Sequence, residues 1–394
     1  MKVRHKVLFI TIVPSPYQRD LFGALAKRAD VDLSVYYMED ASPDSPWPEK
    51  ALRPFERVMP GFWVPFGDAR GHVNWSLPDL SEPHLVVLSS FTSLTGQWLM
   101  RRGLLGKRWL FWGERLHRRS RMKGFIQHRL AAPIRRASAV VGIGRAAEDD
   151  YHQRFPNLSH FCIPYHCDLS AFFAIHRPPK SGAPLTFLFC GQMIRRKGVD
   201  LLLSAFERLK ASGLDARLLL VGREADLPRF LAEVSPATQS RILYQGFQPP
   251  GRLPYYFGMS DVFVLPSRYD GWGVVINQAL AAGLPIITSD AAGAGLDLVN
   301  DGVNGLRVVA GDANLLYRAM EKLAENRNLA RQWGAKSREL AHDMTPEAGA
   351  EKWVQVFKSM NADVARKRDN GPIAKSLHYW LTLQRHWALQ AKAA

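Results

Sequence analysis

The fold is decided by one stretch, Asp261 to Gly305, which reads DVFVLPSRYDGWGVVINQALAAGLPIITSDAAGAGLDLVNDGVNG. An apolar, β-prone run opens it and ends at Pro266. The glycine loop Gly271-Trp272-Gly273 then precedes a helix-compatible segment from Val274 to Ala282. A Gly-Leu-Pro stop follows, and a second strand begins with Ile286 to Thr288. The stretch therefore predicts a β-loop-α-β unit.

The glycine loop of this unit is a candidate ligand site. Unpaired amides at the start of the helix suit a phosphate or the hydroxyl groups of a sugar. Asp270 precedes the glycines and Gln278 lies about two helical turns further on, near the same face. After the second strand, Asp290 to Gly295 reads as a loop of small residues. The alternative is an ordinary glycine loop of an α/β protein with no ligand.

Strands alternate with helical segments along the whole chain, which predicts an α/β protein with parallel, doubly wound sheets. Residues 174 to 184 read as a linker, and residues 40 to 83 read as an extended excursion without clear periodicity. Beyond Thr345 the pattern is helical. The expected strands are Val7 to Val13, Val31 to Tyr37, Leu85 to Leu88, Trp109 to Trp112, Ala139 to Ile143, Leu185 to Cys190, Arg217 to Val221 and Ile242 to Tyr244. The expected helices include 18–29, 198–212, 313–325 and 327–341.

The composition is that of a basic globular protein. The chain has 394 residues, 47% of them hydrophobic and 22% charged, with a formal net charge of +16. Its length suits two domains. Twelve Lys or Arg lie between Arg101 and Arg136 against one acidic residue, Glu114. This excess predicts a polyanionic neighbour, and nucleic acid, anionic lipid and a phosphorylated substrate remain open.

The compartment expected from the sequence is the cytoplasm. The three cysteines show neither an even count nor metal-ligand spacing, so we expect reduced thiols. The apolar run near the N-terminus stops at Pro14 without a cleavage site, and no stretch is long enough to span a bilayer. The last segment, Ser376 to Ala394, predicts either a helix packed on the domains or an interfacial helix.

Two further motifs bear on phosphate and metal binding. Gly191 to Gly198, GQMIRRKG, places three cations at a strand-to-helix junction, where they can neutralise a diphosphate without a metal. A solvated basic turn is the alternative. Asp30-Val31-Asp32 has the Asp-x-Asp pattern of metal-dependent sugar transfer, but it lies where a helix meets a strand, and we interpret it as a polar loop.

Together these motifs resemble glycosyltransferase family 4, whose members are retaining enzymes of the GT-B fold. The resemblance covers nearly all of the second domain and is looser in the first. The markers are Gly191 to Gly198, Gly246, Ser260 to Ser267, Gly271 to Gly273, Ala281 to Pro285 and Asp301 to Gly305, with Pro14 to Tyr17, Gly113 to Arg115 and Pro164 to Phe172, which includes Asp168, in the first domain. The three first-domain segments look like the corresponding loops of family members that build bacterial surface polysaccharides.

The resemblance implies two Rossmann-like domains that face each other across a cleft. Residues 1–173 would bind the acceptor, residues 185–345 would bind the nucleotide sugar, and helices in residues 346–394 would pack back toward the first domain. Asp270 and Gln278 stand where the family usually has two glutamates, and Gln192 replaces a frequent arginine.

The resemblance also implies roles for single residues. The catalytic residues would be Glu114, Lys197 and Asp270, with His117 a weaker substitute for Glu114. The donor would contact Gly191, Gln192, Arg196, Lys197, Gly246, Phe247, Gly271, Trp272, Gly273, Val274 and Gln278. The acceptor would contact Ser15, Tyr17 and Arg115. No metal and no cofactor is expected, because the departing diphosphate can deprotonate the acceptor while Arg195, Arg196 and Lys197 stabilise it.

The sequence therefore predicts a metal-independent, retaining glycosyltransferase at the inner face of the cell membrane. Its partners would be a nucleotide sugar, a lipid-linked or glycan acceptor and an anionic membrane surface. The main alternative is a non-catalytic nucleotide-sugar-binding or scaffold protein. Nucleic-acid binding lacks a recognised module, and an NAD-dependent oxidoreductase lacks the Gly-x-Gly-x-x-Gly motif after the first strand.

Overall fold

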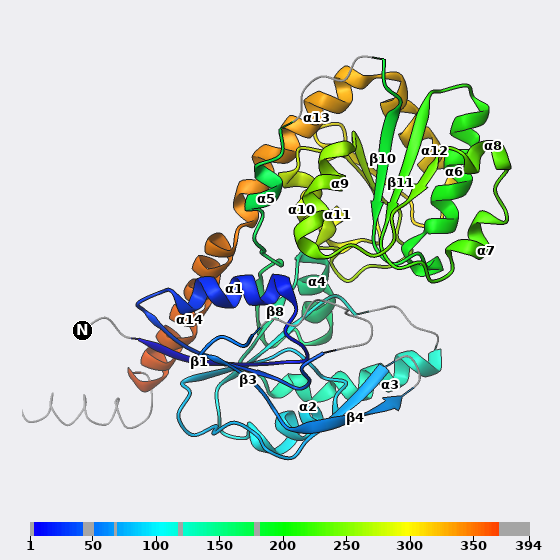
Figure 1. The fold of residues 1–394 in the computed structure, drawn as a ribbon. Coiled ribbons are helices and arrows are strands. Elements are labelled where there is room, and N and C mark those ends of the chain that lie inside the picture. The colour runs from blue at the N-terminus through cyan, green and yellow to red at the C-terminus, as the bar shows by residue number, and fades with distance from the viewer. Residues whose placement is uncertain (1–3, 42–50, 67–68, 117–120, 177–181, 370–394) are drawn as a thin grey trace, which may run out of the picture. The chain divides into compact units, whose positions relative to one another are not determined.

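The structure of the protein is a computed structural model that describes residues 4–41, 51–66, 69–116, 121–176 and 182–369 (Figure 1). Its first sheet is parallel and has the strand order β3-β2-β1-β6-β7-β8-β9. The strands are β1 (His5–Thr11), β2 (Val31–Tyr37), β3 (Glu56–Val58), β6 (Leu85–Leu88), β7 (Trp109–Gly113), β8 (Ala139–Gly142) and β9 (Ser159–Cys162).

The second sheet is also parallel and has the order β12-β11-β10-β13-β14-β15. Its strands are β10 (Leu185–Cys190), β11 (Ala216–Val221), β12 (Ile242–Tyr244), β13 (Val262–Leu265), β14 (Ile286–Ser289) and β15 (Gly305–Val308). In both sheets the strand order turns back beside the first strand of its domain, as in doubly wound Rossmann-like folds. The prediction of two such domains is confirmed.

Helices cover the sheets. Figure 1 shows α9, α10 and α11 on one side of β10 and β11, and α6 and α12 on the other side. The helices of the first domain are α1 (Pro16–Ala26), α2 (Leu94–Trp98), α3 (Arg121–Ala131), α4 (Arg145–Arg154) and α5 (Ser170–Phe173). Those that follow are α6 (Val199–Ala211), α7 (Leu227–Leu231), α8 (Pro236–Gln239), α9 (Leu253–Met259), α10 (Val275–Ala281), α11 (Gly293–Leu298), α12 (Ala313–Glu325), α13 (Arg327–Leu340) and α14 (Pro346–Asp369).

The central strands are buried on both faces. Every residue of β6, β7, β8, β13 and β14 is buried, which explains why these strands read as continuous apolar runs and not as alternating ones. Three of the described helices begin at side-chain caps: the Ser93 hydroxyl oxygen accepts the amide of Gly96, the Asp312 carboxylate accepts the amides of Asn314 and Leu315, and Asn326 accepts the amide of Leu329.

Two expectations differ from the structure. Part of the excursion at residues 40–83 is regular, because β3 joins the first sheet and β4 (Gly61–Phe66) pairs with β5 (Ala69–Asn74) in an antiparallel hairpin. The small-residue loop Asp290 to Gly295 is shorter than expected, because α11 begins at Gly293. Alanine and glycine in this loop allow close packing, and a Cβ at Gly293 would lie 2.3 Å from the carbonyl oxygen of Gly271.

Residues 351–394 form a compact unit of their own. Its described part is the end of α14, in which the rings of Trp353 and Phe357 lie 5.7 Å apart. The expected packing of residues 346–394 toward the first domain stays a prediction. The segment Ser376 to Ala394 lies outside the described residues.

Candidate functional site

A pocket of about 460 Å³ gathers most of the residues expected from the sequence. It lies at the carboxyl ends of β7, β10 and β11, where open α/β sheets place their ligands. Residues of both sheet domains line it. The expected residues in its lining are Tyr17, Glu114, Gly191, Gln192, Arg196, Lys197, Phe247, Asp270, Trp272, Gly273 and Val274.

A buried ion pair lies in this pocket. The Lys197 ammonium group donates to Oδ2 of Asp270, and both side chains are largely buried. Lys197 ends a short 3₁₀ turn, Arg195–Lys197, that follows β10. The next residue, Gly198, has a φ of +74°, and a Cβ there would lie 2.1 Å from the carbonyl oxygen of Pro266. Only glycine fits this close approach, which holds the cationic turn against the end of β13.

The two arginines that precede Lys197 in this turn differ in their placement. Arg196 lines the pocket, and its Nη1 donates to the carbonyl oxygen of Tyr269 at 3.0 Å. Arg195 is exposed and is not part of the lining, so the role expected for it beside the diphosphate stays a prediction. Two cations, Arg196 and Lys197, therefore face the pocket from this turn.

Glu114 faces this ion pair from the first domain. A Cβ at Gly271 would lie 1.8 Å from its Oε2, so the glycine loop accepts the carboxyl group only because residue 271 has no side chain. The Glu114 side chain is exposed toward the pocket, and the walls of the pocket displace part of the water around its carboxyl group. This desolvation, followed by the charge of Asp270, raises the pKa of Glu114, whereas a hydrogen bond with Tyr165 and the charges of Lys197 and Arg196 lower it.

A hydrogen-bonded connection links Glu114 to the glycine loop Gly271 to Gly273. Asn277 Nδ2 donates to the carbonyl oxygen of Tyr165 at 2.8 Å, and Trp272 Nε1 donates to Oδ1 of Asn277 at 3.1 Å. The Tyr165 ring also packs on Tyr17, with centroids 4.6 Å apart. Burial, followed by the charge of Glu114, raises the pKa of Tyr17, so its hydroxyl stays protonated. Tyr165 therefore contacts both sides of the pocket.

Several expected site residues lie outside the pocket lining. Gly246 adopts a φ of +67°, and its carbonyl oxygen accepts the amide of Gly222 at 2.8 Å. Gly271 is in the loop but presents its backbone to Glu114. Gln278 is half-buried, and its Oε1 is a buried acceptor with no hydrogen-bond partner in the described part of the chain. The donor roles of these residues stay predictions.

The three residues expected to contact the acceptor differ in their placement. Ser15 is 2% exposed, and its hydroxyl donates to Oε1 of Gln18 at 3.0 Å, so its contact with an acceptor stays a prediction. Arg115 lies over the ring of Tyr269, 5.9 Å from its centroid, and its Nε and Nη1 have no hydrogen-bond partner among the described residues. Of the three, only Tyr17 lines the pocket.

The sequence analysis missed some residues of the pocket. Gly222 and Arg223 follow β11, so the rule that ligands bind at strand ends was sufficient to find them. Tyr165 lies in the segment Pro164 to Phe172, in which only Asp168 was singled out from the sequence. The Asp168 carboxylate accepts the amide of Ser170 at 2.9 Å. Gln248, Pro250 and Leu253 carry no local signal. His117 lies outside the described residues.

The pocket has no reactive thiolate at Cys190, and the described residues form no clustered metal-ligand set. Cys190 lines the pocket, but burial raises the pKa of its thiol to about 12, so it is protonated at neutral pH. No three His, Cys, Asp or Glu side chains gather there to hold a metal ion. Asp30 of the Asp-x-Asp sequence pairs with Arg28 at 2.9 Å. None of the helices in the described ranges is both long enough and apolar enough to cross a bilayer.

Part of the sequence matches a known family. Residues 173–340 match the family model of glycosyl transferases group 1. Over 170 residues the chain is 31% identical to the lipopolysaccharide core biosynthesis glycosyltransferase LpsE of Rhizobium meliloti, which covers 43% of this chain and 48% of LpsE. The chain thus spans about half or less of the length of the curated relatives that it matches.

Solved structures match almost the whole chain. Sucrose-phosphate synthase from Thermosynechococcus elongatus superimposes with a TM-score of 0.70 at 19% identity, covering 91% of this chain and 100% of that one. HepE of Anabaena, whose structures include complexes with UDP and with UDP-glucose, gives 0.66 at 16% identity for its UDP complex, covering 90% of this chain and 100% of HepE. The chain therefore has the GT-B fold of two Rossmann-like domains, and its residues 173–340 are similar to the group 1 glycosyl transferases.

Proposed function

We propose that the protein is a retaining, metal-independent glycosyltransferase. It moves a sugar from a nucleotide-diphosphate donor to a lipid-linked or glycan acceptor in bacterial surface polysaccharide or glycoconjugate synthesis. One observation carries the proposal: Lys197, Arg196, Asp270 and Glu114 converge on one pocket at the strand ends of both domains. The similarity to LpsE supports the polysaccharide context.

The two cations of the pocket suit the diphosphate of the donor. When the bond between the sugar C1 and the phosphate oxygen breaks, negative charge develops on the leaving group. Lys197 and Arg196 stabilise this charge because they are held in place before the reaction, Lys197 by Asp270 and Arg196 by the Tyr269 carbonyl. The complex of HepE with UDP supports a uridine nucleotide as the first donor to try.

The reaction needs no covalent bond to the protein. The C1–O bond to the acceptor forms on the face from which the diphosphate leaves, and the proton of the acceptor hydroxyl passes to a phosphate oxygen of the leaving group. Asp270 holds Lys197 and lies beside the sugar, while Glu114 and Tyr17 orient the acceptor from the opposite wall. The configuration at C1 is then retained.

We extend the proposal to a peripheral position at the inner face of the cell membrane. Helix α3 exposes Met122, Phe125 and Ile126 at positions i, i+3 and i+4, and Arg129 lies over the Phe125 ring, 5.8 Å from its centroid. An apolar face bordered by cations suits an anionic bilayer. Leu104 and Trp109, which lie among the bases of the stretch Arg101 to Arg136, are buried core residues and add nothing to this exposed face.

The proposal is tested by a donor screen. Purified protein is incubated in EDTA with UDP-, GDP- and ADP-sugars, and the released nucleoside diphosphate is measured. We expect slow hydrolysis of one donor class, faster release when an acceptor is added, and no loss of activity in EDTA. Nucleotide binding without turnover would instead favour the non-catalytic alternative. Complete loss in EDTA with recovery in Mn²⁺ would exclude the metal-free mechanism.

A further inference from the structure

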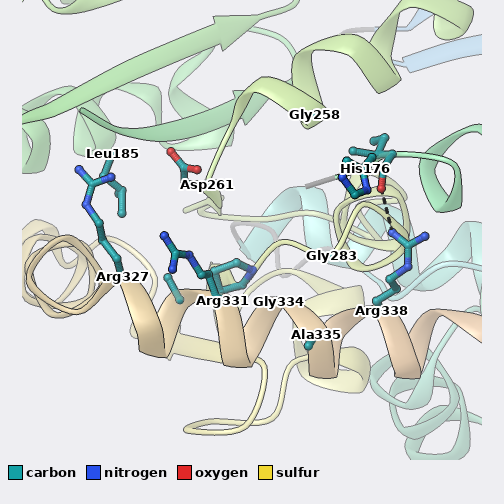
Figure 2. A pocket seen from close by; sticks show the side chains of 13 residues that line it. His176, Leu185, Gly258, Asp261, Gly283, Arg327, Arg331, Gly334, Ala335 and Arg338 are labelled. Carbon is teal, nitrogen blue, oxygen red and sulfur yellow. Dashed lines mark hydrogen bonds between the residues drawn. The ribbon is translucent and has the colours of Figure 1, made fainter. Parts of the chain in front are cut away.

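A second pocket lies at the other end of the second sheet. It has a volume of about 450 Å³ and borders the start of β10, the Gly283 turn before β14, and helix α13 (Figure 2). The donor pocket lies beyond the carboxyl ends of β10 and β11, so the two pockets are separated by the length of the strands. We call this second cavity the α13 pocket.

Three arginines of α13 line the α13 pocket. Arg327, Arg331 and Arg338 are spaced i, i+4 and i+11, which places them on one face of the helix. Figure 2 shows the three side chains projecting from the helix on the same side, with Asp261 across from them. Asp261 is the one carboxylate of the lining, and its Oδ2 accepts the amide of Thr186 at 2.9 Å. The lining therefore carries an excess of positive charge.

Two of the guanidinium groups are held by main-chain carbonyl oxygens. Arg327 Nη2 donates to Ala183 at 2.6 Å, and Arg338 donates to Phe173, Ile175 and Ala281, with 3.3 Å to the oxygen of Ile175. Carbonyl groups orient a guanidinium without cancelling its charge. Among the described residues, none of the three arginines has a carboxylate within ion-pair distance, and Arg331 has no side-chain hydrogen bond. Arg327 and Arg338 are thus held in place, and within the described chain no ion pair compensates the charge of any of the three arginines.

Apart from His176 and Asp261, the rest of the lining is apolar and firmly built. Helix α13 approaches the Gly283 turn so closely that a Cβ at Gly334 would lie 2.2 Å from the carbonyl oxygen of Gly283. Ile175, Leu185 and Pro285 supply apolar wall. A site with arginines on one side and apolar groups on the other suits an anion that carries an organic part.

We propose that the α13 pocket binds a phosphorylated small molecule, with the phosphate against Arg331 and the organic part against the apolar wall. Phosphate is the anion of choice because its double charge and its oxygens match several guanidinium groups at once. The site is independent of the proposed donor pocket, since the two share no residue.

Calorimetric titration of the full chain tests this proposal. Inorganic phosphate and glycerol 3-phosphate serve as probes, glycerol serves as the uncharged control, and UDP is present in excess to occupy the donor pocket. We expect saturable binding of both phosphates, tighter for glycerol 3-phosphate, and no binding of glycerol. In Arg331→Ala the affinity should fall at least about tenfold. The substitution removes an exposed side chain and should leave the fold intact.

A matched variant on the same helix controls for the loss of charge. Lys336 is exposed, pairs with Glu339 at 2.8 Å and does not line the pocket, so Lys336→Ala should bind the probes as the wild type does. Absence of saturable binding, or equal affinity in the Arg331→Ala and Lys336→Ala variants, would overturn the proposal. Phosphatidylglycerol vesicles separate a lipid headgroup from a free phosphate: an Arg331-dependent attachment to vesicles without binding of the soluble probes would also overturn it.

Discussion

Tyr165 contacts residues on both sides of the proposed donor pocket. Its hydroxyl bonds with Glu114, its carbonyl oxygen accepts Asn277 at 2.8 Å, and its ring packs on Tyr17. Asn277 in turn accepts the indole N–H of Trp272. A displacement of Tyr165 would therefore move the Glu114 carboxyl group and the loop that carries Trp272 together. We assign it a positioning role.

Removal of the Tyr165 hydroxyl should change the pH dependence of the proposed transfer reaction. The hydrogen bond from Tyr165 lowers the pKa of Glu114, so in Tyr165→Phe that pKa rises and Glu114 loses its charge at a higher pH. We expect the acidic limb of the kcat profile to move to higher pH and kcat to fall by about one to two orders of magnitude. Tyr151→Phe is the control, because the Tyr151 hydroxyl bonds the main-chain oxygen of Glu114. An unmoved limb in Tyr165→Phe would reject the positioning role.

Glu114 should also cost stability near neutral pH. Its pKa in the folded protein lies above the ordinary value of 4.5, so the folded state binds the proton more tightly than the unfolded state does. The stability that this contributes is present below the unfolded pKa and is lost as the pH rises through the folded pKa. We expect Glu114→Gln to melt at a higher temperature than the wild type near pH 7, with no difference in acid. A variant that is less stable than the wild type near pH 7 would contradict this.

The bounds of helices and strands could be predicted from the sequence where one local signal was strong. β6, β10 and α12 have the expected bounds, because buried parallel strands read as apolar runs and an aspartate caps the helix. The β4–β5 hairpin had no such signal, since its strands carry proline, glycine and polar residues without alternation. β9 was missed as well, because its residues Ser159–Cys162 include no continuous apolar run.

The candidate site was predictable to a similar extent. Motifs that stand at strand ends, such as Gly191 to Gly198 and Asp270 to Val274, do reach the pocket. The partners that complete them come from distant segments: Tyr165 reaches the loop through Asn277, 112 residues away in the chain. Ser15 shows the converse, because a polar residue in the right loop turns its hydroxyl inward to Gln18. Side-chain direction in a loop is set by tertiary packing, which a single sequence does not display.

Helix α10 offers a test of the predicted ribose contact. Its Gln278 carries a buried acceptor oxygen without a partner among the described residues, a costly arrangement that a ribose hydroxyl would relieve. Gln278→Glu replaces the amide oxygen by a carboxylate, which accepts hydroxyl groups more strongly. We expect donor affinity by calorimetry to be equal or up to about tenfold tighter. Loss of binding in a variant with an unchanged melting temperature would mean that Gln278 serves another contact.

For the whole molecule, the net charge of +16 predicts an anionic neighbour, and the proposed membrane surface supplies one. Of the basic stretch, Arg118 and Arg119 lie outside the described residues, and Arg129, Arg135 and Arg136 are exposed. Each base near an anionic bilayer contributes about 1 kcal/mol at ordinary salt. Changing Arg129, Arg135 and Arg136 to Ser should therefore weaken binding to phosphatidylglycerol vesicles by roughly two orders of magnitude.

Flotation with liposomes measures this loss. Binding should weaken at high salt and be absent with neutral lipid. The control carries three Ser substitutions at exposed arginines of the second sheet domain, Arg217, Arg229 and Arg252, and should float like the wild type. Equal flotation of both triple variants, or equal recovery with neutral liposomes, would remove the electrostatic docking model.

Lys197 is proposed to hold the diphosphate of a nucleotide donor, and the affinity gained from the second phosphate of the nucleotide tests this role. Calorimetry compares UDP with UMP, and GDP with GMP if the donor screen selects guanosine, in EDTA. Lys197→Met/Asp270→Asn is compared with the wild type because it removes both members of the buried pair and leaves no unpaired charge. The wild type should bind the diphosphate at least about tenfold more tightly than the monophosphate, and the double variant should lose that difference. Equal affinity of the wild type for both nucleotides, or an undiminished preference in the double variant, would contradict the account.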